Sequence, residues 1–164
     1  MARYSLTFEG VTLTAVADTA AMTDSGYPFF LQGGSATMRL NVSEIYVGGE
    51  SAASAVTKLK FARDSTVAAT AISGDRNAVT DASNTAPGTV AVFGNVSTTK
   101  PQRSATLHLL ALSFNAFGGV VRWVARQGEE PSIVTATQPL GEASLSAFTA
   151  GAGIVSGHCH YEVA

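Results

Sequence analysis

The chain has 164 residues, a formal net charge of −2, 46% hydrophobic residues and only 13% charged residues. A chain of this length can bury a core of its own, and its ten Lys and Arg residues are scattered, whereas nucleic-acid binding requires basic clusters. No apolar run approaches the roughly 18–20 residues that a membrane-spanning helix needs, so we expect neither nucleic acid nor a membrane as a direct partner.

The low share of charged residues indicates what kind of surface the protein has. A typical protein has roughly 25% charged residues, and here Ala, Ser, Thr and Gly take the place of the missing ones. Such a surface is typical of a protein that neighbouring subunits cover, although small-residue β-proteins share this composition. Cys159 is the single cysteine, which excludes an intramolecular disulfide and fits folding in a reducing cytoplasm.

Strand patterns begin near the N-terminus. Tyr4, Leu6 and Phe8 alternate with polar residues, the period of a half-buried strand. Residues 27–31 are apolar around Pro28, and because proline lacks a donor for the sheet ladder we predict an edge strand or the entry to one.

The next segments add a bulge, an edge and a loop. In residues 37–47 the apolar face switches near Ser43 and Glu44, which predicts a β-bulge. Residues 56–63 carry lysines on their polar face, as strands at an exposed edge do. Residues 74–88 are polar and rich in turn residues, which indicates a long surface loop that is functional or mobile.

Residues 104–123 form the longest apolar run, and we expect the core to be built around them. Alternation runs in two registers, which predicts a strand buried on both faces in the middle of a sandwich or barrel. A helix is the competing interpretation, because Leu107, Leu110 and Phe114 also fit a helical stripe. We favour a strand, a turn at Gly118 and Gly119, and a second strand.

The remaining pattern completes an all-β domain. The further predicted strands cover residues 11–15, 89–93, 132–135, 142–148 and 154–163. With about ten to twelve short strands, frequent turn residues and no convincing helix, residues 1–164 are predicted to form a single β-sandwich or barrel domain.

The pair His158 and His160 is the most ligand-like feature. On a strand both rings project from one face, while Cys159 and Tyr161 project from the other. Zinc is bound by such side chains, but two ligands are too few and the sequence offers no third at a recognisable spacing. We therefore expect no metal and no cofactor.

Catalytic patterns are equally weak. No GxSxG elbow is present, and the rings beside Cys159 point away from its sulfur, which is expected to be a small buried hydrophobe. The carboxylates lie mostly in turns, where solvated-loop roles explain them; they are Asp18, Asp24, Asp64, Asp75, Asp81, Glu129 and Glu130. We expect no enzymatic activity.

Several phrases spread over about residues 26–162 resemble a family of small proteins from the head-assembly region of tailed bacteriophages. They are SATMR at 35–39, EIYVGG at 44–49, FARDS at 61–65, LSFNAFGG at 112–119, RW at 122–123 and GEASLS at 141–146. The resemblance implies a capsid decoration or cement protein with a jelly-roll-like β-fold. It further implies a homo-oligomer, with a trimer favoured over a dimer, that is assembled in the host cytoplasm and braces the major capsid protein on the outer face of the virion.

Physical reasoning adds a candidate interface. The apolar segment at 27–31 and the lysine-bearing strand at 56–63 are expected to contact other subunits, the strand by adding to a neighbour's sheet. The candidate residues are Tyr27, Phe29, Phe30, Leu31, Lys58 and Lys60. The alternative function is a receptor- or glycan-binding module of a phage tail or spike, which predicts a cluster of exposed aromatic side chains.

Overall fold

The computed structural model describes residues 2–22, 27–32, 39–66, 76–78, 90–92, 100–134, 141–148 and 152–164. These residues form eleven strands and no helix, which confirms the all-β prediction. No helix that could cross a membrane is therefore found among them. The strands are β1 Ala2–Thr14, β2 Phe29–Gln32, β3 Leu40–Glu50, β4 Val56–Thr66, β5 Arg76–Ala78, β6 Val90–Val92, β7 Gln102–Asn115, β8 Phe117–Val124, β9 Ser132–Ile133, β10 Glu142–Ala147 and β11 Ala152–Val163.

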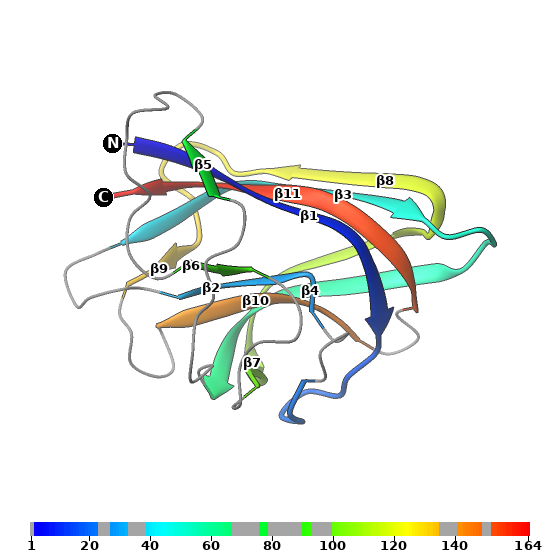
Figure 1. Ribbon diagram of the computed structural model, residues 1–164. Helices are drawn as coiled ribbons and strands as arrows, with labels where there is room; N and C mark the ends of the chain where they lie inside the picture. The colour runs from blue at the N-terminus through cyan, green and yellow to red at the C-terminus, as the bar shows by residue number, and fades with distance from the viewer. Residues whose placement is uncertain are drawn as a thin grey trace.

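The strands form two antiparallel sheets that pack face to face (Figure 1). In sheet A the order is β5-β1-β11-β3-β8, with β9 also paired to β3, and in sheet B it is β6-β2-β10-β4-β7. The predicted sandwich is confirmed. Of the loop predicted at 74–88, the structure describes only the three residues of β5, and the rest lies outside the described residues.

The long strands pair in a nested order, in which the first pairs with the last and so on toward the middle of the chain. β1 pairs with β11, β2 with β10, β3 with β8 and β4 with β7, all antiparallel. Along the chain these eight strands alternate between the sheets, except that β4 and β7 share sheet B. A long hairpin rolled up in this way has the strand order of a jelly roll, the topology that the resemblance implies.

The core lies between the sheets and follows the period of two in the sequence. Tyr4, Leu6 and Phe8 of β1 face it and are at most 4% exposed, and Cys159 and Tyr161 of β11 are fully buried beside them. The inner faces of both sheets contribute to this single cluster. Along β1 and β11, alternation therefore identified the buried face correctly.

A β-bulge in β3 matches the predicted face switch. The register of β3 and β11 pairs Glu44 with His160 but Val42 with Tyr161, so Ser43 is an extra residue in β3. Val42 and Ile45 are consequently both fully buried, while Ser43 and Glu44 both lie on the outer face. Bulges re-aim side chains in this manner.

The apolar run at 104–123 forms a strand, a turn and a strand, as predicted, but the turn falls at Ala116, and Gly118 and Gly119 lie within β8. The predicted central position is also wrong. β7 and β8 each lie at the end of a sheet, with β4 and β3 as their respective ladder partners among the described strands. Leu107, Leu109 and Phe114 are only partly buried. β7 and β8 are the first two long strands after the bend of the rolled hairpin, and each pairs with one neighbour rather than two.

The predicted edge at residues 56–63 is also wrong, since β4 lies between β10 and β7. Pro28, by contrast, directly precedes β2, as expected for the entry to a strand. The lysines of β4 do point outward, but Lys60 lies in a half-buried ion pair with Asp18, its Nζ 3.1 Å from Oδ2.

The outer face of sheet B is covered by the segment that joins β1 to β2. Val16, Met22, Tyr27 and Phe30 form a second apolar cluster there. Beneath the cover the Arg103 guanidinium, 1% exposed, donates to the Val16 carbonyl at 2.5 Å and to Ser146 Oγ at 2.6 Å. Because of this cover, all six residues of β10 are buried on both faces of their strand.

A carboxyl pair is also buried under sheet B. Asp64 and Glu142 are both fully buried, and Ser144 Oγ donates to Asp64 Oδ1 at 2.7 Å. Burial, together with the charge of Glu142, raises the pKa of Asp64 well above its ordinary value. Burial and a neighbouring carboxyl group both disfavour the ionised form of Asp64.

Two adjacent glycines in β3 provide a stability test. A Cβ at Gly49 would overlap the backbone carbonyl of Ala116, whereas one at Gly48 would meet its nearest atoms at 3.9 and 4.0 Å. We expect Gly49→Ala to lower the free energy of unfolding by about 1–3 kcal/mol through overpacking and Gly48→Ala to leave it nearly unchanged. Urea unfolding of the two variants measures the difference, and equal losses would contradict this account of β3.

The pH dependence of stability tests the buried carboxyl pair. Because the pKa of Asp64 is raised in the folded state, its protonation stabilises the fold. This contribution to the free energy of unfolding is fully present below the unfolded pKa near 3.8 and is lost as pH rises toward the folded pKa. We expect Asp64→Asn, which keeps an acceptor for Ser144, to gain stability relative to the wild type as pH rises, each pKa unit corresponding to about 1.4 kcal/mol. Thermal unfolding from pH 4 to 8 tests this, and parallel curves would contradict it.

Candidate functional site

Among the described residues, four large apolar side chains are exposed, and three of them belong to β8. They are Val56, Phe117, Val120 and Val124, with 54–61% of each side chain accessible to solvent. Val56 of β4 pairs with Asn115, the last residue of β7, just before β8 begins. We call these four residues the β8 edge surface. Exposed apolar residues are ordinary when they are scattered singly, but three of these four lie on one strand, β8, at the end of sheet A.

Among the described strands, the one that carries this surface also has an unpaired backbone edge. Within the described part of the chain β8 pairs with β3 on one side only, in a ladder that is regular from Val120 to Val124. Neither β7 nor β8 contains lysine or proline, the residues that commonly prevent edge strands from pairing with other chains. The edge is therefore open both to strand addition and to apolar contact.

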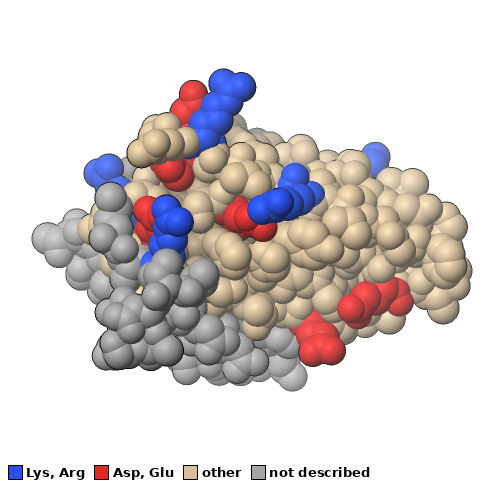
Figure 2. All heavy atoms as spheres, turned by 90° about the horizontal axis from the view of Figure 1, so that it is seen from above, with Lys and Arg blue, Asp and Glu red and all other residues tan. Residues whose placement is uncertain are grey.

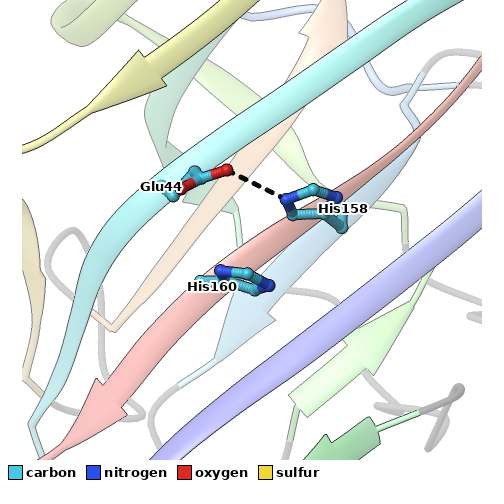
Figure 3. Close-up of side chains that lie close together, drawn as sticks. All are labelled: Glu44, His158 and His160. Carbon is cyan, nitrogen blue, oxygen red and sulfur yellow. Dashed lines mark hydrogen bonds and ion pairs between the residues drawn. The ribbon is translucent and has the colours of Figure 1, made fainter. Parts of the chain in front are cut away.

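A cluster of a different kind lies on the outer face of sheet A. Glu44 of β3 and His158 and His160 of β11 each offer a ligand atom, and these atoms lie within 4.8 Å of one another (Figure 3). The sequence indicated the two histidines but missed Glu44. A signal was present in the bulge expected at Ser43 and Glu44, but the pairing of β3 with β11 was needed to connect it to His160.

Ring stacking and hydrogen bonds fix the geometry of this cluster. The His158 ring stacks on Tyr46 at 5.2 Å between centroids and on His160 at 4.5 Å. His158 Nε2 lies 3.1 Å from Glu44 Oε1. Arg122 of β8 donates to the same carboxylate, from Nε at 3.1 Å and from a terminal nitrogen at 2.9 Å.

The electrostatics follow from these contacts. Hydrogen bonds from Arg122, and then from His158, lower the pKa of Glu44 to about 2 even though burial opposes the shift. Burial and the neighbouring His158 lower the pKa of His160. At neutral pH the cluster therefore contains a carboxylate and an uncharged His160, groups that accept hydrogen bonds or coordinate a cation.

Two shallow hollows flank the cluster on this face. One of about 660 Å³ is lined by His158 and Tyr46 and by small residues such as Gly48 and Gly157. The other, of about 1050 Å³, is lined by Glu44 and His160 together with the ion pair of Arg3 and Glu162. Figure 2 shows charged side chains at the left of this face, near its centre and toward its right side, with uncharged surface between them.

The structure separates the other sequence-predicted groups. Cys159 is fully buried on the core face of β11, away from the outward rings, as expected. Asp18 binds Arg103 and Lys60, and its Oδ2 lies 3.5 Å from His108. Asp24, Asp75 and Asp81 lie outside the described residues.

The predicted interface residues occupy other positions than expected. Tyr27 and Phe30 belong to the cluster that covers sheet B, while Phe29 and Leu31 belong to the main core, and all four are at most 1% exposed. Their side chains are therefore not available to another subunit. The apolar run was assigned to contacts between subunits, but it serves contacts within the chain on both faces of β2.

Comparisons with known proteins identify no relative. No protein-family model, no curated protein and no solved structure matches this chain.

The buried thiol provides a test of the sheet A geometry. Burial raises the pKa of Cys159 far above its ordinary value, so the reactive thiolate is essentially absent from the folded protein. We expect no reaction with a thiol-specific chromogenic reagent at pH 8 until the protein is unfolded, when one equivalent reacts. Rapid labelling of the folded protein would contradict the placement of Cys159 in the core.

Proposed function

We propose that this chain is a structural protein that acts by binding other protein subunits through the β8 edge surface. The observation that carries the proposal is the position of the strongly apolar β8 at a sheet end, with Phe117, Val120 and Val124 more than half exposed. An apolar edge strand without lysine or proline is a liability for an isolated protein, and a partner that covers it removes that liability.

The same surface suggests how a partner is held. Val120 and Val124 lie on the outer side of β8, on either side of Arg122, while Val121 and Trp123 pack against the core. An incoming strand that extends the β3–β8 ladder would satisfy the free backbone groups of β8, and its side chains would cover the valines. Strand addition of this kind combines main-chain hydrogen bonds with side-chain specificity.

We further propose that the partner is a viral shell, as the resemblance implies. In this proposal the chain is a capsid decoration protein that forms a homo-oligomer and bridges subunits of the major capsid protein on the outside of the virion. The jelly-roll topology and the low charge of the chain support this proposal. Repeated contacts over a shell allow modest individual interfaces to sum to tight attachment.

A glycan- or receptor-binding module is less well supported. Stacking on sugars calls for several exposed aromatic side chains close together, and in the described ranges Phe117 is the one aromatic residue in the exposed class. The other described aromatic side chains are buried or half-buried. A sugar array with the purified protein tests this alternative, and specific retention of a glycan would favour it.

Introducing a charge at the apolar edge tests the proposed function. We expect the wild type to self-associate in sedimentation velocity experiments and to co-sediment with capsid shells that lack it. Val120→Asp and Val124→Asp should each lower the affinity of self-association and of shell binding by roughly tenfold or more. Each variant places a charge where an apolar contact of about 1.5–3 kcal/mol is made.

The matched control is Thr12→Asp, which introduces the same charge at an exposed position in β1 of the same sheet. It should leave association unchanged, and circular dichroism should show that all three variants fold. A wild-type protein that remains monomeric and never binds shells would overturn the proposal, as would equal binding by all the variants.

A further inference from the structure

We propose that Glu44, His158 and His160 form a binding site for a divalent transition-metal ion, with Zn²⁺ as the first candidate. Imidazole nitrogens and carboxylate oxygens are ordinary zinc ligands, with bonds of about 2.0–2.2 Å. The three ligand atoms already lie within 4.8 Å of one another. Tetrahedral bonds of that length require the side chains to close by only on the order of 1 Å. The assignment does not depend on the proposed function.

The backbone builds this site at a rigid position. β3 and β11 are adjacent inner strands of sheet A, so neither backbone is at a free edge. The bulge at Ser43 turns Glu44 to the outer face and places it opposite His160. Ser43 Oγ then donates to the His160 carbonyl at 3.2 Å, which connects the bulge to the strand that carries both histidines.

The side chains are held in orientation before any ion arrives. The His158 ring is stacked between Tyr46 and His160, at 5.2 and 4.5 Å respectively, and its Nε2 points at the Glu44 carboxylate (Figure 3). All three candidate ligands are half-buried, so solvent can reach them. Three protein ligands leave the fourth position of a tetrahedral ion to water or to an external donor.

Substitution of Arg122 distinguishes a cation site from an anion site. Its guanidinium binds both oxygens of Glu44, and its side chain is 61% exposed, so it can swing into solvent when a cation takes its place. A cation and this guanidinium compete for the same carboxylate. Arg122→Gln should therefore bind zinc more tightly than the wild type, whereas a site for an anion would lose its ligand on the same change.

The experiment is a titration of tag-free, metal-free protein with ZnCl₂ at pH 7.5, in competition with a chromophoric chelator. We expect one ion per chain. His158→Ala, His160→Ala and Glu44→Gln should each weaken binding by at least the roughly 10–100-fold that loss of even an outer-shell partner causes. Zinc at a hundredfold excess over its dissociation constant should raise the wild-type Tm by roughly 5–10 °C.

The matched control is His108→Ala, which removes the remaining histidine of the chain on the other sheet and should leave zinc affinity unchanged. Absorption bands of tetrahedral Co²⁺ provide a second measurement, and they should disappear in His158→Ala. The proposal would be overturned by wild-type protein that binds no zinc, by binding that survives both His158→Ala and His160→Ala, or by loss of binding in Arg122→Gln.

Discussion

The antiparallel pairing of the two halves of the chain is the constraint on which the rest of the structure depends. Because β1 pairs with β11 and β4 with β7, the chain is a rolled hairpin whose bend lies between β4 and β7. This pairing places β11 at the middle of sheet A and leaves β7 and β8 at the sheet ends. Two features follow from this pairing. The β8 edge surface exists because β8 has no second neighbour among the described strands, and the cluster of Glu44, His158 and His160 forms because β11 lies beside β3.

Local patterns predicted the strands and their buried faces, but not their neighbours. The alternation of Tyr4, Leu6 and Phe8, the switch at Ser43 and the opposed faces of Cys159 and His160 all have the expected burial. These features depend on the pleat of a single strand. Alternation reports which face is covered and carries no information about which strand lies alongside.

The errors arose where a neighbour had to be known. Apolar residues in both registers of β7 were interpreted as burial on both sides, yet β7 is at a sheet end. The apolar segment around Phe29 and Phe30 was interpreted as a surface for other subunits, yet the chain between β1 and β2 folds back over it. Glu44 was not identified as a companion of His158 because 114 positions separate them in the sequence and only the β3–β11 register brings them together.

The position of β11 has a consequence for how the protein is made. β11 follows all the other strands of sheet A along the chain, yet it is an inner strand that pairs with both β1 and β3. Until β11 has been synthesised, β1 and β3 lack the strand that joins them, so sheet A cannot be completed. Contacts between such distant segments make folding slow and the nascent chain prone to aggregation. A chain truncated before residue 152 would therefore lose the middle of its sheet rather than a dispensable tail.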